Sequence, residues 1–174
     1  MPESPFKFCT NCGKDAWIIR SAREFECEPC GFRHFITPMP AAVALILDAQ
    51  NRILLIRRAH EPGLGRLGLP GGVIEPEESG EKAAARETRE EVGLDLPASA
   101  FHYLATLNNR YLFQDFVWPT IDLVYVARVP DFEPLKIDPN EVMETIACPL
   151  NEVPFDDFAF QSNVEAIRRL IESK

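Results

Sequence analysis

The feature that most constrains this chain is a run of residues at fixed spacing between Gly72 and Leu94. Three of its carboxylates, Glu87, Glu90 and Glu91, stand at positions i, i+3 and i+4. On an α-helix these offsets place all three side chains on one face, where like charges repel. Hard divalent cations such as Mg²⁺ or Mn²⁺ take carboxylate oxygens as ligands and relieve that repulsion. The spacing therefore predicts a metal-binding helix, although a single Glu-rich helix is more often a solvated surface helix.

The complete run is Gly72-x5-Glu78-x7-Arg86-Glu87-Thr88-Arg89-Glu90-Glu91-Val92-Gly93-Leu94. It resembles the Nudix box, the signature of hydrolases that act on nucleoside diphosphates linked to another moiety. Every charged and glycine position of that pattern is filled. Thr88 alone departs from it, because the family usually has an aliphatic residue there. We expect the Thr88 hydroxyl to bond back to its own helix backbone.

The resemblance implies a role for each polar residue of the box. Glu87, Glu90 and Glu91 would be the principal ligands of Mg²⁺ or Mn²⁺. The carbonyl of Gly71 would add another ligand, and Glu78 would orient ligands or bind metal through water. Metal ions in such a site neutralise charge on phosphoryl oxygens and activate a water for in-line attack. The implied reaction is therefore cleavage of a pyrophosphate bond.

Other residues complete the predicted site. Arg86 would hold a box carboxylate in a bidentate contact that Lys could not reproduce. Glu141 or Glu144 would supply a further base or metal ligand from the far side. Arg58, at a strand end, and Trp118, beside an expected turn, are candidates for substrate binding.

The three histidines are expected to be satisfied or surface residues. They are His34, His60 and His102, which are isolated in the sequence. No Ser or Cys with a His partner resembles a nucleophile, so no covalent enzyme intermediate is expected.

Four cysteines near the N-terminus form a second motif. Cys9-x2-Cys12 and Cys27-x2-Cys30 are separated by 14 residues, close to the spacing of tetrahedral zinc sites. Two disulfides or four free thiols are the alternatives. Disulfides are disfavoured because the N-terminus lacks the plan of a secretory signal. Four thiolates leave no open coordination position, which indicates structural Zn²⁺ rather than a catalytic metal.

Residues 1–36 look like a zinc ribbon. Segments 17–20 and 24–26 are predicted to be two short strands within it. The ribbon carries five Lys or Arg and five Asp or Glu, and this neutral balance disfavours nucleic-acid binding as its role. Two prolines in residues 37–40 predict a stiff linker to a second domain, so that residues 37–174 form the Nudix domain.

The second domain shows the pattern of an α/β fold. Strands are predicted at 41–47, 52–57, 101–107, 110–113, 121–129 and 141–148, with turns between them. The box helix is predicted to start near Ser79 or Gly80 and to end at Gly93, with a small-residue face for packing on a sheet. Residues 164–171 predict a closing amphipathic helix, and the lone Cys148 is expected to pack as a small hydrophobe. This order fits a mixed sheet with helices on both faces, and the resemblance implies the α/β/α sandwich of the Nudix family.

Composition narrows the class of partner. The chain has 174 residues, 46% of them hydrophobic, and a net charge of −9. This acidity disfavours a surface that coats nucleic acid but is compatible with small anionic substrates beside a bound metal. No apolar run reaches the roughly 18 residues of a membrane span. A cytoplasmic location is expected by default, and the sequence leaves a homodimer open.

The substrate class follows only from the resemblance. A zinc ribbon ahead of a Nudix domain is similar to NADH pyrophosphatases, but their Ser-Gln-Pro-Trp-Pro-Phe-Pro-type motif after the box is missing. The leading hypothesis is a pyrophosphate hydrolase acting on a substrate such as ADP-ribose, NADH or FAD. One alternative is a nucleotide sensor whose ribbon contacts nucleic acid or protein, and another is a nucleoside triphosphate pyrophosphohydrolase. The intact acidic helix favours an enzyme over a sensor.

Overall fold

The computed structural model describes residues 6–173, which form two compact units divided between Pro38 and Met39. The first unit is a three-stranded antiparallel sheet in the order β1-β2-β3. Its strands are β1 (Trp17–Ile19), β2 (Glu24–Cys27) and β3 (Arg33–Phe35). The two strands predicted in this segment are present. The third strand, β3, was not predicted from the sequence.

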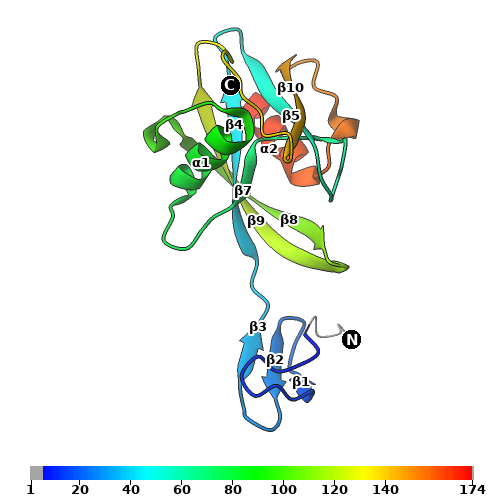
Figure 1. Ribbon diagram of the computed structural model, residues 1–174. Coiled ribbons are helices and arrows are strands. Elements are labelled where there is room, and N and C mark those ends of the chain that lie inside the picture. Colours follow the sequence, from blue (N-terminus) through cyan, green and yellow to red (C-terminus); the bar gives the residue numbers. More distant parts are fainter. Residues whose placement is uncertain (1–5, 174) are drawn as a thin grey trace. The chain divides into compact units, whose positions relative to one another are not determined.

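The second unit is built on a mixed sheet with the strand order β10-β5-β4-β9-β8 (Figure 1). The strands are β4 (Met39–Leu47), β5 (Arg52–Arg58), β8 (His102–Phe113), β9 (Phe116–Arg128) and β10 (Val142–Pro149). β4 and β9 run parallel, whereas the other neighbours are antiparallel. Two short strands, β6 (Leu67–Gly68) and β7 (Gly71–Val73), pair with β5 and β4 respectively.

Two helices, α1 (Gly80–Val92) and α2 (Gln161–Glu172), cover opposite faces of this sheet. Strand β4 shows why, because residues 42–47 are all buried and alternate side chains enter different core clusters. Val43 and Leu45 share a cluster with Ile167 of α2, whereas Ala42 and Ala44 share one with α1. The predicted α/β/α sandwich with a mixed sheet is confirmed. Short 3-10 helices span Ala98–Ala100 and Phe155–Asp157.

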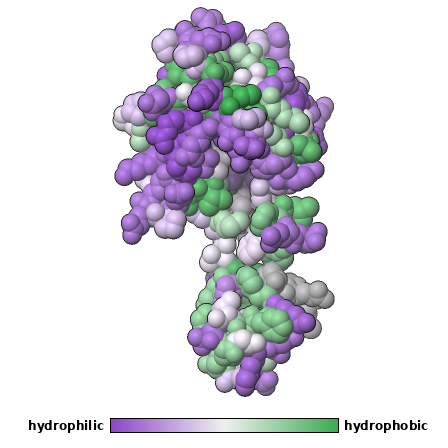
Figure 2. Space-filling model, viewed as in Figure 1, coloured by the Kyte–Doolittle hydropathy of each residue, from purple (hydrophilic) through white to green (hydrophobic). Residues whose placement is uncertain are grey.

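The ends of α1 are set by local signals that the sequence displays. The Ser79 side chain accepts a hydrogen bond from the Lys82 N–H and caps the first turn. Gly93 adopts a left-handed conformation with φ of 77°, and its N–H bonds to the Arg89 carbonyl. The predicted helix bounds are therefore confirmed. On the face drawn in Figure 2, hydrophilic residues gather over α1, where Lys82, Arg89 and Glu90 are exposed.

The hairpin of β8 and β9 differs from the sequence prediction. The sequence predicts a break after Leu107, but β8 is continuous there and Asn109 pairs with Thr120. The chain reverses instead at Gln114 and Asp115, which both have positive φ, as a two-residue hairpin turn requires.

The prediction of a turn beside Trp118 is also wrong, because Trp118 and Pro119 lie within β9. Pairing of β9 with β4 starts only at Thr120. Pro119 therefore has a single neighbouring strand and occupies an edge position, where a missing N–H is tolerated.

The predicted linker is shorter than expected, because Met39 and Pro40 belong to β4. The Pro40 carbonyl accepts a hydrogen bond from Ile74, so this proline takes part in the sheet through its acceptor. The lone Cys148 is 7% exposed within the α2-side core, as expected for a small hydrophobe. No helix among residues 6–173 is long and apolar enough to cross a membrane.

The Thr88 hydroxyl does not form the bond expected of it. The residue is fully buried on the sheet-facing side of α1, and its Oγ1 has no hydrogen-bond partner among the described residues. A buried hydroxyl without a partner lowers stability, because it loses its bonds to water and gains none in return.

We therefore expect Thr88→Val to raise the free energy of unfolding by about 1 kcal/mol, since valine keeps the shape and removes the unsatisfied hydroxyl. Chemical unfolding with urea measures the change. Thr88→Ser is the control, because it keeps the hydroxyl and loses the methyl group, and it should be less stable than the natural chain. A valine variant that unfolds at lower urea would contradict this account of Thr88.

Candidate active site

Arg86 lies among the carboxylates of the acidic helix face. Its Nη1 donates to Glu87 Oε1 at 2.7 Å and to Glu90 Oε2 at 3.2 Å. Its Nε and Nη2 donate to the two oxygens of Glu78 at 3.1 and 2.9 Å. The bidentate contact predicted for Arg86 is thus made with Glu78, and these hydrogen bonds hold the pKa of Glu78 below its usual value. One guanidinium ties the loop before α1 to the acidic face.

Glu91 is the most deeply buried of the three carboxylates, at 7% exposure. It accepts a hydrogen bond from the Gly71 N–H at 3.1 Å. Burial, together with the nearby charges of Glu87 and Glu141, raises the pKa of Glu91 to about 8. No Lys or Arg among residues 6–173 forms an ion pair with it. A buried carboxyl of this kind is costly to ionise unless a cation lies beside it.

A cavity of about 320 Å³ opens beside these residues. Glu87 and Glu91 line it from α1, and Gly71 and Gly72 line it from β7. A Cβ at Gly72 would displace the Glu87 carboxylate, so glycine here lets that carboxylate lie against β7. Glu90 is exposed and is not part of the lining. The volume is at the lower end of the range typical of small-molecule sites.

Glu141 and Glu144, the two candidates for the far side of the site, have different surroundings. Glu141 lines the cavity, and its charge adds to burial in raising the pKa of both Glu87 and Glu91. Glu144 does not line it, and its carboxylate binds Arg57 Nε at 2.7 Å. The structure therefore brings Glu141, and not Glu144, to the acidic helix.

His60 has partners at both ring nitrogens, which fits the prediction of a satisfied histidine, and one of these partners is a candidate site residue. Its Nε2 lies 2.6 Å from Glu141 Oε2, and its Nδ1 lies 2.8 Å from the Glu61 carbonyl oxygen. The Glu61 carbonyl and an ionised Glu141 carboxylate both only accept hydrogen bonds, so each of the two ring nitrogens that face them would have to donate. His60 thereby orients the Glu141 side chain.

The two candidates for substrate binding also differ. Arg58 lines the cavity, where its Nε donates to the Pro62 carbonyl and its guanidinium lies over the Phe160 ring at 5.1 Å. Trp118 is not part of the lining and packs edge-on against Phe116, with ring centroids 4.8 Å apart.

Sequence reasoning missed the wall of the cavity that faces α2. Its polar and aromatic residues come from β8, β9 and the start of α2; they are Asn109, Tyr111, Thr120, Asp122, Phe160 and Asn163. One signal was available in the sequence. Asp122 interrupts the otherwise apolar stretch from Ile121 to Val126, where a charge is out of place in a central strand.

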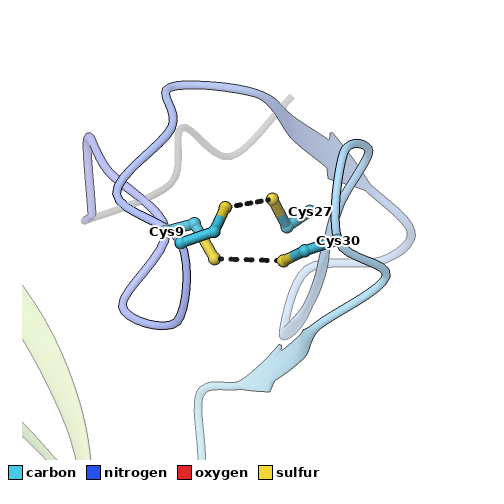
Figure 3. A group of neighbouring side chains, drawn as sticks. Cys9, Cys27 and Cys30 are labelled. Carbon is cyan, nitrogen blue, oxygen red and sulfur yellow. Dashed lines mark hydrogen bonds between the residues drawn. The ribbon is translucent and has the colours of Figure 1, made fainter.

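The Sγ atoms of the four cysteines of the first unit all lie within 4.8 Å of one another (Figure 3). The Sγ atoms of Cys9 and Cys30 are 3.8 Å apart, and those of Cys12 and Cys27 are 3.5 Å apart. Tetrahedral thiolates at a Zn–S distance of about 2.3 Å would be about 3.8 Å from one another. The cluster therefore has the size and donor set of a zinc site with four thiolate ligands.

The backbone around the cysteines also fits a metal site. Gly13 and Gly31, which follow the two cysteine pairs, have positive φ of 74° and 68° and close tight turns on the Cys9 and Cys27 carbonyls. A hydrogen bond from the Phe32 N–H lowers the pKa of the Cys30 thiol to about 6. The thiolate form is therefore favoured at Cys30, whereas burial raises the pKa of the Cys27 thiol to about 12.

Comparison with known proteins gives consistent matches. A family profile of the NUDIX domain matches residues 37–170. An NAD-capped RNA hydrolase of Stutzerimonas stutzeri is 33% identical over 93 residues, or 53% of this chain and 33% of that protein. An ADP-ribose pyrophosphatase of Methanocaldococcus jannaschii is 43% identical over 63 residues, or 36% of this chain and 37% of that protein. The chain thus spans about a third of the length of these curated relatives.

The fold has a close counterpart among solved structures. The crystal structure of a NUDIX hydrolase from Nitrosomonas europaea superposes with a TM-score of 0.70 and covers 97% of this chain and 92% of its own. Its sequence identity to this chain is 24%, so the likeness concerns the fold alone.

Proposed function

Since this chain belongs to the Nudix family, we propose that it is a metal-dependent hydrolase of a nucleoside diphosphate-linked substrate of the ADP-ribose, NADH or FAD class. The observation that carries the proposal is the buried Glu91 carboxyl, which faces a cavity beside two further carboxylates and forms no ion pair with a Lys or Arg of the described residues. The curated relatives include an NAD-capped RNA hydrolase and an ADP-ribose pyrophosphatase, which supports this substrate class.

The acidic face would hold the metal. Glu87, Glu90 and Glu91 would bind Mg²⁺ or Mn²⁺, with the Gly71 carbonyl as a further ligand. The bound metal supplies positive charge for the phosphoryl oxygens and lowers the pKa of water. Arg86 holds the Glu87 carboxylate in place, and Glu78 in turn holds Arg86.

Glu141 would act as the base on the far side of the cavity. It accepts a proton from water while the water oxygen forms a bond to phosphorus and the bond from phosphorus to the bridging oxygen breaks. Two phosphate monoesters result. His60 keeps the Glu141 carboxylate oriented, and Arg58 places a positive charge in the cavity that favours the anionic substrate. This assignment leaves Glu144 and Trp118 without a catalytic role.

The N-terminal unit would be a structural zinc ribbon over residues 1–36, joined to a catalytic Nudix domain over residues 37–174. Cys9, Cys12, Cys27 and Cys30 would bind one Zn²⁺. So small a unit buries little apolar surface, and the metal would therefore supply much of its folding free energy.

A hydrolysis screen tests the proposed function. Purified full-length chain, with Mg²⁺ or with Mn²⁺, should convert ADP-ribose to AMP and ribose 5-phosphate, or NADH to AMP and reduced nicotinamide mononucleotide. Nucleoside triphosphates serve as the comparison, because release of pyrophosphate from them would instead indicate a triphosphate pyrophosphohydrolase. A chain that binds these nucleotides but cleaves none of them with either metal would favour a sensor over an enzyme.

A further inference from the structure

The strongest unexplained feature outside the acidic helix is Asp122. It lies in β9, between β4 and β8, and is only 3% exposed while lining the cavity. No Lys, Arg or His among residues 6–173 forms an ion pair with it. Its nearest partners are hydroxyl and amide groups, including the Thr120 Oγ1 at 3.4 Å. Burial raises the pKa of Asp122, so the folded chain bears a cost for keeping a carboxyl here.

The surroundings of Asp122 define the kind of ligand that would compensate this cost. The carboxamides of Asn109 and Asn163 line the same wall, and the rings of Tyr111 and Phe160 stack with centroids 5.8 Å apart. A phosphate would be repelled by the carboxyl, and a ribose has no planar aromatic ring that could stack on the two side-chain rings. A heteroaromatic base has both a flat face and a polar edge.

The sheet register gives the distance between this wall and the strand that carries Gly71 and Gly72. Asp122 pairs with Ala41 on β4, and Ala41 pairs with Val73 on β7. Asp122 therefore lies two strand spacings, about 10 Å, from the strand that carries Gly71 and Gly72. One cavity thus joins an end suited to a pyrophosphate with an end suited to a base.

We propose that Asp122 is a specificity-determining residue that, together with Asn163, binds the polar edge of an adenine base in the substrate. The adenine amino group would donate to the Asp122 carboxyl, and a ring nitrogen would accept from a carboxamide, the pairing that Asn makes with adenine edges elsewhere. In the same orientation, guanine would turn an oxygen acceptor toward the Asp122 carboxyl where adenine presents its amino group. The inference deepens the proposed function and rests on it for the position of the phosphates.

Equilibrium binding tests the proposal without any turnover. Isothermal calorimetry on the full-length chain in Mn²⁺ compares AMP, GMP and ribose 5-phosphate, the last of which has no base. The natural chain should bind AMP at least about tenfold more tightly than either of the others. Asp122→Leu, which is close in shape, should weaken the binding of AMP by about 10–100-fold and leave the binding of ribose 5-phosphate unchanged. Asp122→Asn, which keeps one acceptor, should lose less affinity for AMP than Asp122→Leu does.

Asp95→Leu is the matched control, because Asp95 is exposed and does not line the cavity, and it should leave all three affinities unchanged. Thermal unfolding should show both Asp122 variants at least as stable as the natural chain, since each removes a buried ionisable group. The proposal would be overturned if Asp122→Leu lost affinity for AMP and ribose 5-phosphate equally, or lost no affinity for AMP. It would also be overturned if the natural chain bound GMP as tightly as AMP. None of these results depends on hydrolysis, so a failure of the proposed function would be recognised separately.

Discussion

Replacement of Glu91 by glutamine is expected to abolish most turnover while making the metal-free protein more stable. Glutamine keeps the shape of the side chain but removes a charge that the metal needs. Residues that merely orient a metal ligand typically contribute about 10–100-fold to activity, and loss of a ligand itself should exceed about 100-fold. Steady-state kinetics on ADP-ribose at saturating Mg²⁺ measures the loss.

The stability effect follows from the pKa of Glu91. Its value of about 8 in the folded chain lies above the ordinary value of 4.5, so the folded state binds the proton more tightly than the unfolded state. The free energy of unfolding without Mg²⁺ or Mn²⁺ therefore falls as the pH rises from 4.5 towards 8. Glu91→Gln removes this fall and should be more stable at pH 8 by ~1–3 kcal/mol.

Glu81→Gln provides the control for both measurements. Glu81 lies in the first turn of the same helix and does not line the cavity. Its replacement should leave turnover within about twofold and the pH dependence of stability unchanged. Normal turnover in the Glu91→Gln variant at saturating Mg²⁺ would show that Glu91 does not take part in catalysis.

The double replacement Cys9→Ser and Cys12→Ser is expected to release the zinc and to unfold the N-terminal unit. Two of four thiolates would be lost, and two remaining ligands cannot close a tetrahedral site. Elemental analysis should find about one zinc per natural chain and none in the variant, and proteolysis should then cleave before Met39. Because the acidic helix and the cavity lie in the second unit, turnover should persist at a substantial fraction of the natural rate.

Cys148→Ala is the control for the cysteine replacements, since Cys148 belongs to the core of the second unit and is not a member of the four-cysteine cluster. It should retain one zinc per chain, with a modest loss of stability from the smaller side chain. Full retention of zinc by the double serine variant would exclude the four cysteines as its ligands. Complete loss of activity in a variant whose second unit stays folded would mean that the ribbon is required for catalysis.

The features that could be predicted from the sequence are those that depend on residues close together in the chain. The start and end of α1 depend on a cap at Ser79 and a left-handed Gly93, both visible locally. The acidic face follows from helical periodicity, and the cysteine cluster follows from two short spacings. The order of apolar segments fitted a mixed sheet with helices on both faces, because buried strands and amphipathic helices have different periods. The α/β/α sandwich itself was implied by the resemblance to the Nudix family.

The features that could not be predicted depend on which strands become neighbours. Asn109 looks like a turn residue, yet it is held in β8 by pairing with Thr120. Pro119 looks like the end of a strand, yet β9 tolerates it because β4 pairs only from the next residue.

The cavity wall illustrates the same limit. Asn109 and Asp122 come from the hairpin of β8 and β9, and Asn163 comes from the distant α2, so the three meet only once the sheet and α2 are assembled. The contact between His60 and Glu141 likewise joins the end of β5 to the start of β10. Neither has a local signature, apart from the charge of Asp122 in an apolar stretch.

The position of bond cleavage tests the central claim most directly. Full-length chain is incubated with ADP-ribose and Mg²⁺ in water enriched in ¹⁸O, and the products are analysed by mass spectrometry. Attack of water at phosphorus predicts AMP and ribose 5-phosphate, with one ¹⁸O atom on the phosphate of one of the two products. Label on a sugar carbon, or release of free adenine in place of AMP, would show that a glycosidic bond is broken and would contradict the assignment of this chain as a pyrophosphate hydrolase.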